Sequence, residues 1–568
     1  MLRLKGIFSI ILILILVPFY LTAGIEAKTY DLIIRNGKII DGTNNPWFYA
    51  DIGITGDRID AIGNLSKAKT KKSIDARGRI VCPGFIDMHT HCDYDIGSPL
   101  CKANLNYLIQ GVTTVVTGNC GESVSLDVTK TKEKWEKQGI GTNAVLLVGH
   151  GNIRQKVMKN ALRKASSEEI DKMKVVVRKA MEEGAWGMST GLEYNPGRFA
   201  DTEEVITLTH IVAEYNGVYA THMRDEAARI IDAINETIRI AEETGIRADI
   251  SHLKVTGKNN WGLMEDAIQA IEGARQKGIY IVADQYPYIQ SAPIGLLSTF
   301  VEIPETMEPL AKLRKKINQN HWWEPDWESV QSTYHKELIK TLKNDSSRNE
   351  IKQLTLHGQP KNPSAVAMWG WHDFTVLVAL KNLKLVGTNF SDISDKGDAA
   401  IFDKIVELII DEPNILYGGG SQSQTDHSTA MKQNWVMVSS DGLAHPISQD
   451  ITKQVRDHPR DFGSQTRALR KFVREEKLLT LEDAVRKMTS LPASFLQLKN
   501  RGLLIEGFKA DLVIFDPQTV RDNATYADSR RYASGVDYVL IDGKISIEKG
   551  EYKGALNGKL LLLTENHL

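Results

Sequence analysis

Two histidines set one residue apart point most directly to chemistry in this sequence. His89 and His91 end the apolar, β-prone segment 83–91. Because side chains at positions i and i+2 of a strand project to the same face, both imidazoles can reach one metal ion. Asp87, two residues earlier, shares that face. A pair of ordinary strand histidines would give the same short motif. Whether it indicates a metal site therefore depends on the rest of the chain.

Further candidate ligands follow later segments that read as strands. Each segment ends in a side chain that can bind a metal or carry a proton, namely Cys120, His222, His252 and Asp441. In a barrel of parallel strands, the carboxyl ends of the strands form the active site. A lone histidine at a strand end is usually structural. Five potential ligands and an acid in one register are hard to reach by chance, and they predict a metal site.

The ligand types narrow the choice of ion. A thiolate with imidazoles favours zinc over magnesium or calcium. Zinc held by three protein ligands keeps a fourth position open, where water has a pKa of about 7 and supplies hydroxide for hydrolysis of a carbonyl compound. Asp441 is then placed to take the proton of that water and pass it to a leaving nitrogen. The alternative role for Asp441, before Gly442, is a helix N-cap.

Short apolar segments alternate with amphipathic helical ones, such as 225–244, and must position these residues. Such alternation predicts βα units around a parallel sheet. Eight segments are expected to be strands: 83–91, 112–118, 143–150, 184–191, 217–223, 247–253, 279–286 and 434–441. Eight is the number of strands in a (β/α)8 TIM-like barrel, so the predicted fold class is α/β.

The remaining segments predict two additions to the barrel. Short β-like runs fill 28–80 and 499–568, and they are expected to pair into one small β-sandwich domain built from both chain ends. Barrel strands 1–7 occupy 81–290. The stretch 291–430 is too long for a loop and predicts an insertion between strands 7 and 8. The eighth strand and its following helices occupy 431–498.

Composition limits the class of protein, and the first residues indicate its cellular location. The chain has 568 residues, a net charge of −1, 42% hydrophobic and 25% charged residues, so it can bury a large core and lacks the basic bias of a nucleic-acid-binding protein. In residues 1–27, two basic residues precede an apolar run and then small residues, which predicts a secretory signal peptide. The run of about 15 residues is shorter than the roughly 20 that span a bilayer. The body is therefore expected to be secreted or periplasmic, an uncleaved anchor stays an alternative, and the oligomeric state stays open.

Four cysteines lie close together in the sequence. Cys82, Cys92, Cys101 and Cys120 all fall within residues 82–120. An even number in an exported protein invites disulfides, although a chain of this size does not need them for stability. Pairing among the first three therefore stays open.

The chain resembles the amidohydrolase superfamily, and within it the N-acyl-D-amino-acid deacylase (D-aminoacylase) family. The motifs that carry the resemblance are Pro-Gly-Phe-Ile-Asp-Met-His-Thr-His at 83–91, Gly-Val-Thr-Thr-Val-Val-Thr-Gly-Asn-Cys-Gly at 111–121, Val-Gly-His-Gly at 148–151, Ser-Thr-Gly-Leu-Glu-Tyr-Asn-Pro-Gly at 189–197, Thr-His-Met-Arg-Asp-Glu at 221–226, Ser-His-Leu-Lys at 251–254, Tyr-Pro-Tyr at 286–288, Ser-Asp-Gly at 440–442 and His-Pro-Arg at 458–460. Cys120 discriminates best, because hydantoinase-like relatives commonly use a carboxylated lysine and the strand 184–191 has no lysine.

The resemblance implies a role for each matching residue. Cys120, His222 and His252 would be the tight zinc ligands, and His89 with His91 would form a second, weaker site that shares Cys120. Asp441 would be the general acid/base. The residues implied in substrate binding are Lys254, Tyr286, Ser291, Arg460 and Tyr194. Among these, the arginine fork matches an α-carboxylate.

Two features depart from the family pattern. The spacing from Asp441 to Arg460 is longer than usual and a second His-Pro pair, His445-Pro446, intrudes, so we expect a rebuilt loop, and a surface role for Arg460 stays open. Where relatives acting on acidic D-amino acids are expected to offer an arginine, this chain has the apolar run 292–300. We therefore expect a preference for side chains such as leucine, methionine or phenylalanine. The alternative, that this run packs inside the insertion, stays open.

The sequence thus predicts a zinc-dependent hydrolase that removes the acyl group from small N-acyl-D-amino acids by attack of hydroxide on the amide carbonyl. One alternative is a zinc dipeptidase or another cyclic or linear amide hydrolase of the same superfamily. The other is a non-catalytic binding protein on a barrel scaffold. An acid opposite an open zinc position would have no use in a binding protein, which argues against it.

Overall fold

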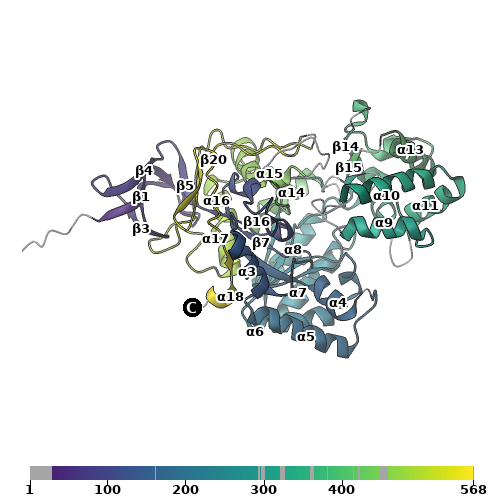
Figure 1. Ribbon diagram of the computed structural model, residues 1–568, viewed down its shortest axis with the longest axis horizontal. Helices are drawn as coiled ribbons and strands as arrows, with labels where there is room; N and C mark the ends of the chain where they lie inside the picture. The colour runs from purple at the N-terminus through teal and green to yellow at the C-terminus, as the bar shows by residue number, and fades with distance from the viewer. Residues whose placement is uncertain are drawn as a thin grey trace, which may run out of the picture.

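A computed structural model describes residues 28–159, 161–291, 294–295, 301–319, 327–358, 364–379, 381–412, 415–419, 422–446, 458–526 and 528–566. The predicted leader and most of the apolar run 292–300 lie outside these residues. Figure 1 shows a central barrel with a β domain at one end of the molecule and a helical insertion at the other. Within the described ranges, no helix has the length and apolar character needed to cross a membrane.

Eight parallel strands form the barrel, and their order in the sheet is their order in the chain. They are β6 (Phe85–Asp87), β7 (Val112–Thr117), β8 (Asn143–Gly149), β9 (Gly187–Gly191), β10 (Val218–His222), β11 (Arg247–Ile250), β12 (Ile281–Gln285) and β16 (Val436–Val438). The barrel closes where the amide of Asp441 donates to the carbonyl of His89 and the amide of His91 donates to the carbonyl of Gly442, both at 2.8 Å. The predicted barrel is confirmed, and each predicted strand segment contains one of these strands.

Helices cover the outside of the barrel, so its strands are buried on both faces. They are α1 (Asp93–Ile96), α2 (Leu105–Leu108), α3 (Val128–Gln138), α4 (His150–Met158), α5 (Ser167–Glu182), α6 (Thr202–Glu214), α7 (Ile230–Thr244), α8 (Met264–Gln276), α14 (Gln424–Met431), α15 (Arg460–Arg467), α16 (Leu481–Met488), α17 (Ser490–Leu496) and α18 (Leu563–Asn566). Helix α7 begins five residues later than the predicted 225–244. The carboxylate of Asp225 accepts hydrogen bonds from the amides of Ala227 and Arg229 at 2.8 and 2.9 Å, and these bonds hold a turn there.

Strands from both chain ends share one sheet beside the barrel. Its members are β1 (Thr29–Ile39), β2 (Phe48–Thr55), β3 (Arg58–Gly63), β4 (Lys69–Asp75), β5 (Ile80–Pro83), β17 (Leu512–Phe515), β18 (Val536–Ile541), β19 (Lys544–Glu548) and β20 (Glu551–Tyr552). The two ends meet where β5 pairs antiparallel with β17. A β-bulge lets β1 pair first with β4 and then with β5, so the sheet bends around a core that includes Ile34, Ile52 and Ile514. A second domain made from both ends is therefore confirmed.

The insertion lies between β12 and β16 and has a core of its own. Its elements are β13 (Ile294–Gly295), α9 (Glu308–Gln319), α10 (Trp327–Leu342), α11 (Asp345–His357), α12 (Ala365–Trp369), β14 (Thr375–Val378), α13 (Asp398–Asp411) and β15 (Leu416–Gly418). Tyr334, Phe374 and Phe402 belong to a buried cluster separate from that of the barrel. The insertion is thus a helical subdomain, drawn in green at the far end of Figure 1.

All four cysteines are free thiols. Cys82, Cys92 and Cys101 are buried in the barrel core, and burial raises the pKa of the Cys101 thiol to about 12. These three side chains therefore act as small apolar residues. Cys92 Sγ also meets the hydroxyl of Thr90 at 3.2 Å, whereas Cys120 lies among histidines.

Candidate metal centre and active site

A tight turn after β7 presents Cys120 to the mouth of the barrel. The turn begins at Gly118, where a side chain would lie 2.1 Å from the carbonyl oxygen of Leu147, so only glycine fits. Cys120, His252 and Asp441 all have positive φ angles, of 52°, 39° and 52°. Non-glycine residues adopt this region rarely, and such strain concentrates at functional sites. Three candidate site residues thus share a backbone conformation that the fold must enforce.

Cys120, His222 and His252 point three donor atoms at one position. Cys120 Sγ lies 3.9 Å from His222 Nδ1 and 3.5 Å from His252 Nε2, and the two nitrogens are 3.0 Å apart. Zinc–sulfur and zinc–nitrogen bonds in tetrahedral geometry require donor separations of about 3.3 to 3.6 Å. The three observed donor separations, which run from 3.0 to 3.9 Å, span this range. The donor set therefore fits one zinc ion held by three protein ligands.

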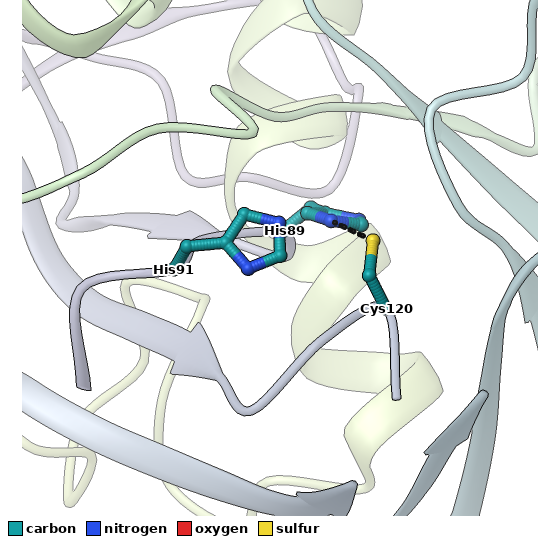
Figure 2. A group of neighbouring side chains, drawn as sticks. All are labelled: His89, His91 and Cys120. Atoms are coloured by element: carbon teal, nitrogen blue, oxygen red, sulfur yellow. Dashed lines mark hydrogen bonds between the residues drawn. The ribbon is translucent and has the colours of Figure 1, made fainter. Parts of the chain in front are cut away.

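His89 and His91 form a second group of donors with Cys120. Figure 2 shows both imidazoles beside the thiol, with the dashed line joining His89 Nε2 to Cys120 Sγ at 3.4 Å. The donor atoms of all three residues lie within 4.8 Å of one another. Cys120 thus belongs to both groups, in the arrangement that the resemblance implies for a shared ligand.

Carboxylates, two of them buried and that of Glu193 partly exposed, face the ring nitrogens that point away from these positions. Asp284 Oδ2 lies 3.2 Å from His89 Nδ1, Glu193 Oε2 lies 2.7 Å from His222 Nε2, and Glu226 Oε1 lies 2.9 Å from His252 Nδ1. A carboxylate in this position fixes the ring and makes a ligating histidine more basic. None of the three was singled out from the sequence. Glu193 and Glu226 do fall inside family motifs, and Asp284 lies at a strand end.

The charges at the centre favour a thiolate. Burial alone would raise the pKa of Cys120, but His89 and His91 hold it well below its ordinary value. Burial would lower the pKa of His222, whereas Glu226 and Cys120 raise it to about 10. Metal binding at His222 therefore competes with a proton, which makes metal affinity rise with pH.

Asp441 lies across the barrel mouth, between the histidines and an arginine. Its Oδ1 is 3.1 Å from His91 Nε2 and 3.5 Å from His89 Nε2, and its Oδ2 accepts a hydrogen bond from Arg460 at 2.7 Å. Burial would raise the pKa of Asp441, but Arg460 and His91 hold it well below its ordinary range. The side chain is therefore a carboxylate at neutral pH and can accept a proton. It caps none of the helices in the described part of the chain.

The candidate substrate residues form the wall next to Asp441. The guanidinium of Arg460 lies 5.0 Å from the ring centre of Tyr286, and the ammonium of Lys254 lies 5.9 Å from it. Tyr194 places its hydroxyl 3.0 Å from His222 Nδ1. Ser291 faces the insertion instead, where its hydroxyl donates to the carbonyl of Gly419. Four of the five candidates thus lie near the candidate metal ligands and Asp441.

The longer spacing before Arg460 does not displace it from Asp441. His458 holds the start of α15, because its Nδ1 accepts from the amide of Arg460 at 2.9 Å and its Nε2 donates to the carbonyl of Gln290 at 3.1 Å. His445 is buried, stacks on Phe462 and bonds Asp461 at 2.8 Å. The extra His-Pro pair is therefore a packing feature of the loop after β16. Residues 447–457 lie outside the described part of the chain.

A buried histidine beneath Tyr286 predicts loss of stability in acid. His427 Nε2 donates to the carbonyl of Tyr286 at 2.9 Å, and burial, with nearby Lys471 and Arg467, lowers the pKa of His427 to about 4. A histidine that is harder to protonate folded than unfolded contributes stability above pH 6.5, and this contribution is lost as the pH falls toward 4. The loss should reach about 3 kcal/mol.

Urea unfolding of the metal-free protein between pH 7.5 and 4 would measure this loss. His427→Gln, which can still donate to Tyr286, should flatten the pH dependence, and the same change at exposed His210 should leave it as it is. Equal slopes in wild type and His427→Gln would contradict the assignment.

Comparisons with known proteins agree with this geometry. Residues 72–324 and 435–547 match the Amidohydrolase family, and the gap between them contains most of the insertion. The chain is 30% identical to D-aminoacylase of Alcaligenes xylosoxydans xylosoxydans over 571 residues, which cover 95% of this chain and 99% of that one. A structure from work on the binuclear metal centre of D-aminoacylase is 29% identical, with a TM-score of 0.71 and coverage of 94% and 100%. N-acyl-D-glutamate deacylase from Bordetella bronchiseptica, solved with zinc and a phosphonate mimic of the tetrahedral intermediate, is 28% identical, with the same TM-score and coverage.

Proposed function

The chain belongs to the amidohydrolase family, as a deacylase of the N-acyl-D-amino-acid type, and from this premise we propose that it removes the acyl group from N-acyl-D-amino acids by zinc-dependent hydrolysis. One observation carries the proposal. Cys120, His222 and His252 converge at the same end of the barrel as Asp441 and Arg460. Ligands, a proton carrier and a cation for a carboxylate are the three parts that such a reaction needs.

Cys120, His222 and His252 would hold the working zinc ion, and His89 with His91 would hold a second, weaker one through the same thiolate. Bound there, zinc would lower the pKa of a water molecule and polarise the amide carbonyl. Glu193, Glu226 and Asp284 keep the rings in place from behind. The zinc-bound relative supports this choice of ion, as does the mixed sulfur and nitrogen donor set.

Asp441 moves the proton in the proposed reaction. As a carboxylate it accepts a proton from the attacking water, and as the resulting acid it returns that proton to the amide nitrogen when the C–N bond breaks. Its hydrogen bonds with Arg460 and His91 keep it ionised before the reaction. The acyl group leaves as a carboxylic acid and the D-amino acid as a free amine.

Arg460, Lys254 and Tyr286 would orient the substrate. A guanidinium presents two parallel N–H groups to a carboxylate, so Arg460 suits the α-carboxylate of an amino acid. Lys254 forms an ion pair with Glu226 at 2.7 Å, and the hydroxyl of Tyr286 accepts a hydrogen bond from Gln422 at 3.0 Å. These contacts fix the positions of both side chains before a substrate binds. Tyr194 would contact the substrate near the proposed metal position, because its hydroxyl lies 3.0 Å from His222 Nδ1.

We further propose that apolar side chains are preferred. The support is the sequence of residues 292–300, which offers no cation to an acidic side chain. The first experiment is the rate of amine release by the zinc-loaded protein from N-acetyl-D-methionine, N-acetyl-L-methionine and N-acetyl-D-glutamate. The D-methionine compound alone should be turned over well.

Each outcome of that assay bears on a different statement. Hydrolysis of N-acetyl-D-glutamate at a rate comparable to that of N-acetyl-D-methionine would contradict the apolar preference. The deacylase assignment would still hold. Failure with all three compounds, in protein that holds zinc, would redirect the search to dipeptides and cyclic amides.

An extracytoplasmic location completes the proposal. Its support is the order of basic, apolar and small residues in 1–27. Amino-terminal sequencing of protein recovered outside the cytoplasm should find Lys28, or a residue near it, as the first residue. Recovery of the intact chain from the cytosol would refute this location.

A further inference from the structure

One connection in the β domain is much longer than its geometry requires. Strands β17 and β18 are antiparallel neighbours, which a turn of two to five residues can join. Residues 516–535 join them instead. Long connections in compact domains are usually functional or flexible, so the contacts of this segment decide between the two.

The first anchor of the segment is Asp522, which is buried against α15 and the helical turn that continues it. Its carboxylate bonds Arg467 at 3.1 Å and Arg470 at 2.6 Å. Arg467 in turn donates to the carbonyl of Pro287 at 2.7 Å, and its guanidinium lies 4.4 Å from the ring centre of Tyr288. Asp522 therefore ties the β domain to the segment that follows β12 and begins with Tyr286.

The second anchor is Tyr526, which reaches the wall of the active site. Its ring lies edge-on to His458, with 5.0 Å between centroids, and 6.4 Å from Tyr288. Burial raises the pKa of its hydroxyl, and the nearby backbone of Gln290 acts in the opposite direction. His458 bonds both the carbonyl of Gln290 and the amide of Arg460. Tyr526 thus touches the residue that links Arg460 to the 286–291 segment.

We propose that the 516–535 connection is part of the active site and that Tyr526 is a positioning residue, which acts through His458 and Gln290 to hold Arg460 for the carboxylate of the substrate. This inference rests on the proposed function. Tyr526 itself touches no candidate metal ligand in the described residues, and Asp441 lies beyond Arg460. Loss of Tyr526 should therefore weaken substrate binding more than it slows the bond cleavage.

The test compares Tyr526→Ala, Tyr526→Phe and the matched control Tyr552→Ala. Tyr552 is a tyrosine of the same domain that bonds the carbonyl of Ala555 at 3.0 Å and contacts no site residue. With N-acetyl-D-methionine, Tyr526→Ala should raise KM about tenfold while kcat stays within about threefold, with an unchanged zinc content. Tyr526→Phe keeps the ring against His458 and should raise KM by only about threefold. Tyr552→Ala should match wild type.

A double-variant cycle with Arg460→Lys shows whether Tyr526 acts through the arginine. If it does, adding Tyr526→Ala to Arg460→Lys should raise KM by less than twofold, because residues that act through one another are not additive. A KM within about twofold of wild type for Tyr526→Ala, or full additivity with Arg460→Lys, would overturn the inference. If Tyr526→Ala fails to fold, Tyr526→Phe decides, since it removes only the hydroxyl group. Absence of turnover by the wild type would instead overturn the proposed function and this inference with it.

Discussion

Replacing Asp441 with asparagine should lower kcat for N-acetyl-D-methionine by about 10³-fold and leave the bound zinc in place. Asparagine keeps the size of the side chain and can still meet Arg460 and His91, but it cannot accept a proton at neutral pH. Both proton transfers of the proposed reaction pass through this one carboxylate. The loss should therefore appear in kcat, with KM changed little.

Zinc content and melting temperature, measured beside the kinetics, separate lost chemistry from lost structure. Asp426→Asn is the matched control, because Asp426 is a buried aspartate of α14 that accepts a hydrogen bond from the amide of Gly262. It should keep activity close to that of wild type. An Asp441→Asn enzyme with more than a tenth of the wild-type kcat would show that another group carries the proton.

Replacing Cys120 with serine should abolish activity by removing the metal. The thiol is the one donor shared by the two groups of ligands, and a serine hydroxyl is a poor substitute for a thiolate on zinc. After dialysis, zinc per chain should fall well below one, and the rate should fall with it. Cys101→Ser, which changes a buried cysteine away from the site, should keep both.

Variants of the other candidate ligands test which of the two donor groups holds the zinc ion that is needed for activity. His222→Asn and His252→Asn should behave like Cys120→Ser, because each removes a donor from the triangle proposed to hold the working ion. His89→Asn or His91→Asn should leave about one zinc ion bound. Retention of a full equivalent of zinc by Cys120→Ser would exclude the thiolate as a necessary ligand.

The barrel and the family were predictable because their signals are local. His89, Cys120, His222, His252 and Asp441 each follow directly on a short apolar run, and parallel strands bring such positions to one edge. Both predictions are confirmed, by the strand order and by the family match. The roles assigned to these residues remain predictions until the variants are measured.

The contacts that hold the site residues in place were not predictable, because they join residues that are far apart in the chain. Asp284 meets His89 and Tyr526 meets His458 only after the barrel has closed and the β domain has docked. No spacing in the sequence encodes such pairings. His445 shows the reverse case, since a conspicuous motif proved to be a buried packing residue.

The pairing of β5 with β17 also determines when the sheet of the β domain can finish folding. Pro83 lies opposite Leu512, so the sheet in front of the first barrel strand stays unfinished until nearly the whole polypeptide has been synthesised. Contacts of such sequence separation give a high contact order and slow folding. During that interval the amino-terminal strands present open edges to other chains. A shortened chain that ends before β17 would keep every candidate metal ligand and still lack the partner that closes its first sheet, which makes it prone to aggregate.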